Sequence, residues 1–158
     1  GSAFRSRGTE PFLKRLTRQL VAYMLGAEEK TPAECVCKAR KLIESGSMDV
    51  RQLARGEYLS MSPEAYRKKI EAGGKPRRAS LEVALRMNPP PRMGERVLYY
   101  ILPKEKGQTS DWQRARPLHD FDVQAAPYAA DYYLKKLDEW LKRYADFVGD
   151  TSGQEELF

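Results

Sequence analysis

The residues best suited to bind a charged ligand are six basic side chains within one short stretch of the chain. Only one acidic residue, Glu71, interrupts them, and they are Arg67, Lys68, Lys69, Lys75, Arg77 and Arg78. Basic side chains neutralise phosphates and release counterions, so this cluster predicts binding to a polyanion that weakens as salt rises. The stretch has no recognisable motif of a sequence-specific reader, which favours contact with backbone phosphates over base edges. A solvated basic face without a ligand is the alternative interpretation.

The other reactive residues do not form a recognisable catalytic set. The single histidine, His119, has no nucleophile motif to accompany it. The segment from Gly73 to Lys75 lacks both the preceding strand and the following Ser or Thr that a phosphate-binding loop needs. Cys35 and Cys37 are one residue apart on a predicted helix, where their side chains point to different faces. We interpret them as free thiols in a reducing compartment.

Two aspartates, Asp120 and Asp122, are the only candidates that we find for a metal site. On a strand, alternate residues share a face, so the pair could hold a magnesium ion and support a metal-dependent nuclease. A solvated acidic loop is the interpretation that we favour. We therefore predict no catalytic residue, no metal site and no cofactor in this chain.

Charge is distributed unevenly along the 158 residues. The net charge is +6, but residues 1–106 contribute +10 and residues 107–158 contribute −4. A basic body with an acidic end indicates a polyanion on one surface and a different partner at the other. The chain has no run of about 18 apolar residues, so we predict no membrane partner and a cytoplasmic, nucleoid-associated location. Gly1 and Ser2 are interpreted as a tag remnant.

Periodic apolar residues and capping signals predict a mostly α-helical fold with a small β element, an α+β fold with one small strand pair. The Thr31–Pro32–Glu34 pattern is a capping box that starts one of the helices. The single strong strand signal is the β-branched and aromatic run at 97–102. Residues 48–61 and 103–126 read as loops, the first with a possible short extended piece. The predicted helices cover about 11–25, 32–45, 63–72, 80–87 and 127–148.

Four segments in a fixed order carry a family resemblance. They are 53–66, in which Leu59–Ser60–Met61 precedes Tyr66, then 79–86, 94–101 and 131–134. The series resembles the thumb region of family B DNA polymerases, where corresponding stretches occur in the same order. Two positions depart from the family pattern. Ala79 and Ser80 stand where the family has Pro-His, and Met61 stands where a basic residue is usual.

The resemblance implies a thumb-like duplex-binding domain over 3–149, without the catalytic carboxylates of a palm. The chain would be the thumb domain, or a small split subunit, of a family B DNA-directed DNA polymerase acting in replication or repair. It would be inactive alone and would need a palm and fingers portion, in the same or a second chain, which would hold the magnesium. The residues implied to contact the primer–template duplex are Ser60, Tyr66, Arg67, Lys68, Lys69, Lys75, Arg77, Arg78, Ser80 and Arg86.

The last residues of the chain predict a second binding partner. Gln154, Leu157 and Phe158 have the Gln-x-x-Leu-Phe form of peptides that bind sliding clamps. Leu157 and Phe158 would fill an apolar pocket while Gln154 forms a hydrogen bond at its rim. We expect 150–158 to be a flexible tail carrying this motif. The alternative function is a non-catalytic adaptor, a degenerate thumb that docks a sliding clamp or a polymerase.

Overall fold

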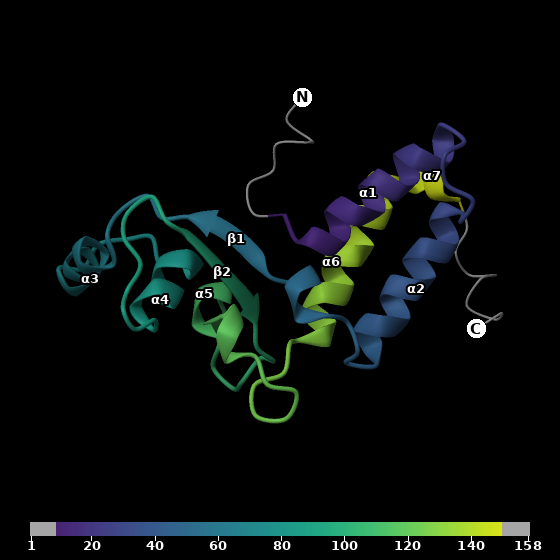
Figure 1. The fold of residues 1–158 in the computed structure, drawn as a ribbon. Helices are drawn as coiled ribbons and strands as arrows, with labels where there is room; N and C mark the ends of the chain where they lie inside the picture. Colours follow the sequence, from purple (N-terminus) through teal and green to yellow (C-terminus); the bar gives the residue numbers. More distant parts are fainter. Residues whose placement is uncertain (1–8, 150–158) are drawn as a thin grey trace. The chain divides into compact units, whose positions relative to one another are not determined.

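The computed structural model describes residues 9–149 and divides the chain into two compact units (Figure 1). The helical unit combines Glu10–Leu53 with residues from Ala130 onward, and the sheet unit is built on Ala54–Ala129. In the described range, no helix combines the length and the apolar character required to cross a membrane.

The helical unit contains α1 (Pro11–Met24), α2 (Pro32–Glu44), a 3₁₀ turn at Val50–Gln52, α6 (Ala130–Arg143) and α7 (Ala145–Val148). The predicted capping box starts α2. The Thr31 hydroxyl accepts a hydrogen bond from the Glu34 amide at 3.2 Å, and the Glu34 carboxylate accepts one from the Thr31 amide at 3.1 Å. Two of the orphan amide groups at this helix end are thereby satisfied, which fixes where α2 begins.

The helical unit is held together by an apolar interior with polar contacts at its margin. Leu16, Val36, Ile43 and Leu137 are almost fully buried, and α2 packs against both α1 and α6. At the margin of this core, the indole N–H of Trp140 donates a hydrogen bond to the Thr17 hydroxyl at 3.0 Å. The indole therefore buries its ring without leaving its only donor unsatisfied.

Both cysteines lie on α2, both are buried, and neither forms a disulfide. Their side chains occupy core positions beside Val36. Burial raises the pKa of the Cys35 thiol above its ordinary value, with a smaller contribution from the negative charge of Glu28. Raising its pKa lowers the fraction of reactive thiolate, so Cys35 behaves as a small apolar core group.

The sheet unit contains β1 (Arg55–Tyr58), α3 (Pro63–Glu71), α4 (Ala79–Leu85), β2 (Arg96–Ile101), α5 (Asp111–Arg114), β3 (Ala115–Pro117) and a 3₁₀ turn at Leu118–Asp120. The strands form one antiparallel sheet in the order β1-β2-β3. Gly56 pairs with Leu98, and Tyr100 pairs with Arg116. The central strand β2 is therefore hydrogen-bonded on both edges.

One face of this sheet is covered and the other is partly open. Val97 and Tyr99 are buried, and α4 packs against β2 and β3. On the alternate positions of the same strands, Tyr58 and Leu98 remain exposed. Gly56 lies directly under the guanidinium of Arg96, so a side chain at this position would displace that group.

The predicted class, mostly helical with a small β element, is confirmed: about half of the chain is helical and the sheet is small and antiparallel. The loop prediction for 103–126 was wrong in part, because α5, β3 and a 3₁₀ turn lie within it. The sequence predicts one small strand pair, whereas the sheet has three strands because β3 adds to it. The last helix begins at Ala130 instead of Pro127 and is interrupted at Tyr144.

Leu137 and Leu25 provide a matched pair of leucines for testing the core of the helical unit. Leu137 is fully buried, whereas Leu25 is 79% exposed. Leu137→Ala should lower the free energy of unfolding by about 2–5 kcal/mol because it removes buried methyl groups and leaves a cavity. Leu25→Ala should change it by less than about 0.5 kcal/mol. Urea denaturation followed by circular dichroism measures both, and equal effects would contradict the described packing.

Candidate functional site

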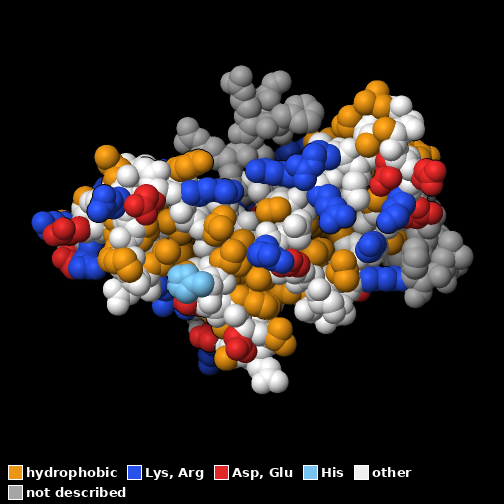
Figure 2. All heavy atoms as spheres, viewed as in Figure 1, with side chains coloured by type: hydrophobic (Ala, Val, Ile, Leu, Met, Phe, Trp, Pro, Cys, Tyr) orange, Lys and Arg blue, Asp and Glu red, His pale blue; other side chains and the backbone are white. Residues whose placement is uncertain are grey.

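The basic cluster lies on α3 and on the segment that joins α3 to α4, within the sheet unit. Arg67, Lys68 and Lys69 are exposed on α3, with Lys68 near Glu64 at 3.6 Å. Figure 2 shows blue basic and red acidic side chains side by side at the far left of the view, where α3 lies in Figure 1. Lys75, Arg77 and Arg78 follow in the connecting segment and are also exposed. All six basic residues are thus accessible to a ligand.

Helix α3 begins and ends at signals that the sequence supplies. The Ser62 hydroxyl accepts a hydrogen bond from the Ala65 amide at 3.1 Å and caps the start. Gly73 ends the helix with a φ of +86°, a conformation that L side chains rarely adopt. At Gly74 a Cβ atom would lie 2.7 Å from the carbonyl oxygen of Lys69, so the close turn requires glycine there as well. The chain is therefore reversed directly after the basic helix.

A buried tyrosine connects α3 to the returning segment. Tyr66 is only 1% exposed, and its hydroxyl accepts a hydrogen bond from the Arg78 amide at 3.1 Å. Burial, followed by the negative charge of Glu82, raises the pKa of the Tyr66 hydroxyl, although the Arg78 amide opposes this shift. The Arg78 guanidinium in turn donates a hydrogen bond to the Ser60 hydroxyl at 2.6 Å. Ser60, Tyr66 and Arg78 are thus brought together.

Not all of the predicted duplex contacts are accessible in the sheet unit. Tyr66 and Ser80 are both buried, so neither side chain is available to a ligand in this structure, and Tyr66 supports Arg78 instead. Arg77 is exposed, but its guanidinium already contacts two side chains of the protein. Its guanidinium lies 2.6 Å from the Glu82 carboxylate and 4.7 Å from the centre of the Trp112 ring. The remaining exposed positions carry the positive charge of this surface.

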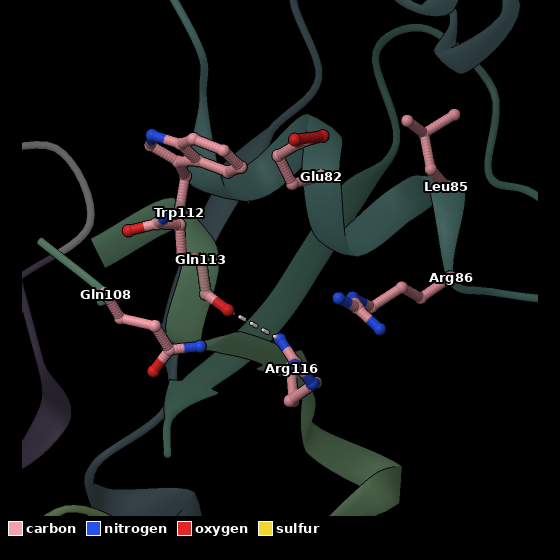
Figure 3. A pocket seen from close by; sticks show the side chains of 7 residues that line it. All are labelled: Glu82, Leu85, Arg86, Gln108, Trp112, Gln113 and Arg116. Atoms are coloured by element: carbon pink, nitrogen blue, oxygen red, sulfur yellow. Dashed lines mark hydrogen bonds between the residues drawn. The ribbon is translucent and has the colours of Figure 1, made fainter. Parts of the chain in front are cut away.

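Arg86, the last of the predicted contact residues, lies apart from the cluster at the other end of α4 and faces a separate hollow. The hollow has a volume of about 460 Å³ and lies between α4, α5 and β3 (Figure 3). In Figure 3 the guanidinium of Arg86 points into the space beside Arg116. The polar and aromatic lining residues are Glu82, Arg86, Gln108, Trp112, Gln113 and Arg116.

Of the residues that line this hollow, only Arg86 was among the sequence-predicted site residues, and four of the others come from one segment that was predicted to be a loop. Gln108, Trp112, Gln113 and Arg116 fall within 103–126, which the sequence predicts to be a loop. The signal in the sequence that could have indicated helix α5 is its capping box, formed by Ser110 and Gln113. The Gln113 side chain accepts hydrogen bonds from the amides of Thr109 and Ser110 at 2.8 and 3.0 Å. This short helix is what brings Trp112 beside α4.

The two aspartates considered for a metal site have local roles. The Asp122 carboxylate accepts hydrogen bonds from the amides of Gln124 and Ala125, both at 2.8 Å, which lower its pKa. Asp120 lies 3.4 Å from the ring of His119. Within residues 9–149, no three acidic, cysteine or histidine side chains come together in a way that could hold a metal ion. The clamp-binding motif, Gln154, Leu157 and Phe158, lies outside the described residues.

Comparison with known proteins identifies no relative, since neither a protein-family model nor a curated protein sequence matches this chain.

Replacing Tyr66 with phenylalanine tests the link between α3 and the returning segment. Tyr66→Phe removes the acceptor of the Arg78 amide and should lower the free energy of unfolding by about 1–3 kcal/mol. Tyr58→Phe is the matched control, because Tyr58 is 72% exposed and its change should cost less than about 0.5 kcal/mol. Urea denaturation measures both. An unaffected Tyr66→Phe variant would show that the hydrogen bond does not hold this turn.

Proposed function

We propose that this chain is the thumb of a family B DNA-directed DNA polymerase, or a small split subunit of one, and that it grips the primer–template duplex by its phosphate backbone in replication or repair. The catalytic carboxylates and their magnesium ions belong to a palm and fingers portion in the same or a second chain. The observation that carries the proposal is the exposed basic surface of α3 and the α3–α4 segment, held by the contact between Tyr66 and Arg78.

The physical character of this surface supports backbone gripping. Its charges are arginine and lysine side chains on a short helix and on the segment that returns beside it, so several phosphates of one strand are within reach. Ser60 is exposed next to Arg78 and adds a hydroxyl of the kind that contacts phosphate oxygens. The order of the four resembling segments is the second support for assigning this surface to a polymerase thumb.

Removing charge from α3 tests duplex binding. In fluorescence anisotropy with a labelled duplex at low salt, the Arg67→Gln/Lys68→Gln/Lys69→Gln variant should bind at least about tenfold more weakly than the parent chain. Its slope of log affinity against log salt should become shallower by about 0.9 for each phosphate that the variant no longer neutralises. The parent should bind duplexes of unrelated sequence equally well, because phosphates carry no sequence information.

The control for this experiment removes the same amount of charge elsewhere in the sheet unit. Arg92, Lys104 and Lys106 are exposed and lie outside the proposed surface. Changing all three to glutamine should leave duplex affinity within about twofold, since these residues touch no phosphate in the proposal. Equal weakening of both variants would indicate non-specific attraction, and undetectable binding by the parent would contradict the duplex grip.

The tail is tested separately, with a purified sliding clamp on a biosensor surface. Leu157→Ala/Phe158→Ala removes the two apolar side chains proposed to enter the clamp pocket and should reduce binding at least about tenfold. Duplex binding by the same variant should be unchanged. Clamp capture by a parent chain that has no duplex affinity would favour the adaptor over the thumb, whereas undetectable clamp binding by the parent would contradict the assigned motif.

A further inference from the structure

The hollow between α4, α5 and β3 brings together the guanidinium groups of Arg86 and Arg116, neither of which forms an ion pair with a carboxylate in the described part of the chain. No hydrogen bond or ion pair of the Arg86 side chain is found within residues 9–149. Arg116 donates to two backbone carbonyl oxygens, of Gln113 at 3.1 Å and of Ala115 at 2.8 Å, which hold its side chain at the wall of the hollow. Figure 3 shows the Arg116 guanidinium beside that of Arg86.

The one carboxylate that lines the hollow is already neutralised. Glu82 is held by Arg77 at 2.6 Å, and Arg77 in turn lies over the Trp112 ring. The two cations beside it repel each other. Burial, and then the positive charge of Arg86, lowers the pKa of the Arg116 guanidinium, although the negative charges of Glu105 and Asp120 partly oppose this shift. An anion bound between the two arginines would replace this repulsion with two charge-assisted interactions.

The charge and size of the hollow favour one class of anion. Two guanidiniums match a phosphate monoester, which carries about two negative charges near neutral pH, better than a phosphodiester with one. The volume of about 460 Å³ exceeds what a phosphate alone fills and is within the range of small-ligand pockets, roughly 300–1,000 Å³. Trp112 provides an aromatic surface for a planar base. The side-chain NH₂ group of Gln108 provides a hydrogen-bond donor, since the Gln108 side-chain oxygen already accepts a hydrogen bond from the Glu105 amide at 2.9 Å.

We propose that this hollow binds a nucleoside monophosphate group, with the phosphate between Arg86 and Arg116 and the base beside Trp112. The group is either a free mononucleotide or the terminal nucleotide of a 5′-phosphorylated strand. The proposal goes beyond the duplex grip and does not depend on it, because the basic residues of α3 take no part. It also gives Arg86 a role different from the duplex contact that the family resemblance implies.

Isothermal titration calorimetry on the full chain tests this site with deoxyadenosine monophosphate, inorganic phosphate and deoxyadenosine as probes. The monophosphate should bind with one-to-one stoichiometry, phosphate alone should bind more weakly, and deoxyadenosine should bind at least about tenfold more weakly than the monophosphate. Arg86→Gln should weaken binding of the monophosphate at least about tenfold. Arg86 is exposed at the end of α4, so this variant should keep its fold.

The matched control is Arg92→Gln, which removes one exposed arginine from the same unit outside the hollow. It should leave the affinity for the monophosphate within about twofold. Absence of binding at millimolar monophosphate would overturn the proposal, as would equal weakening by Arg86→Gln and Arg92→Gln. Arg86→Lys, which keeps the charge but loses the two-pronged donor geometry, should bind with intermediate affinity.

A second pair of probes distinguishes the two sources of the ligand. A single-stranded oligonucleotide with a 5′-phosphate is compared with the same strand carrying a 5′-hydroxyl. A gain from the phosphate that disappears in Arg86→Gln identifies a strand end. Binding of the mononucleotide without such a gain identifies the free nucleotide. The α3 triple variant should bind the duplex more weakly and keep its affinity for the nucleotide, so the failure of one proposal is separable from the failure of the other.

Discussion

The exposed basic surface depends on one buried contact, the hydrogen bond from the Arg78 amide to the Tyr66 hydroxyl. This bond joins helix α3, which carries Arg67–Lys69, to the segment that carries Lys75–Arg78, and it opposes the repulsion between their like charges. The contacts of Arg78 with Ser60 and of Arg77 with Glu82 also hold the returning segment. Because Tyr66 is anchored in the core, it offers a fixed acceptor to the returning chain. Gly73 and Gly74 make the return possible, since the turn has no room or no suitable backbone conformation for a side chain. The repulsion between cations is thus opposed by core packing.

Helix α4 divides the polar surface of the sheet unit into two parts with different electrostatics. Near its start, Arg77 is paired with Glu82 and covered on one side by Trp112, so its charge is largely compensated within the protein. At its end, Arg86 has no such compensation and faces Arg116. The same helix therefore separates an arginine held in an ion pair from two arginines that form no ion pair within residues 9–149. That contrast, and not the total of +6 for the chain, is what distinguishes the hollow from the rest of the surface.

Local signals in the sequence were sufficient for the elements that carry their own caps or strong periodicity. The Thr31–Glu34 capping box, the Ser62 cap and the β-branched run of β2 all correspond to structured elements at or near the predicted residues. The elements missed between 103 and 126 are short, and β3 is a strand only because β2 supplies its hydrogen-bonding partner. The basic cluster could be predicted because its six residues are close together in the sequence. The pairing of Arg86 with Arg116 could not, because it requires α5 and β3 to be placed against α4.

Because both cysteines of α2 are buried, the protein is suited to site-specific labelling at an introduced cysteine. Cys35 and Cys37 are inside the core, and burial holds the Cys35 thiol in its unreactive protonated form. A single cysteine introduced at an exposed position would therefore react first with a maleimide fluorophore or a nitroxide spin label, with no need to remove the native thiols. Because both native thiols belong to the helical unit, any later loss of their protection would report the opening of that unit alone. The reactivity of Cys35 and Cys37 toward a thiol reagent would thus measure opening of the helical unit.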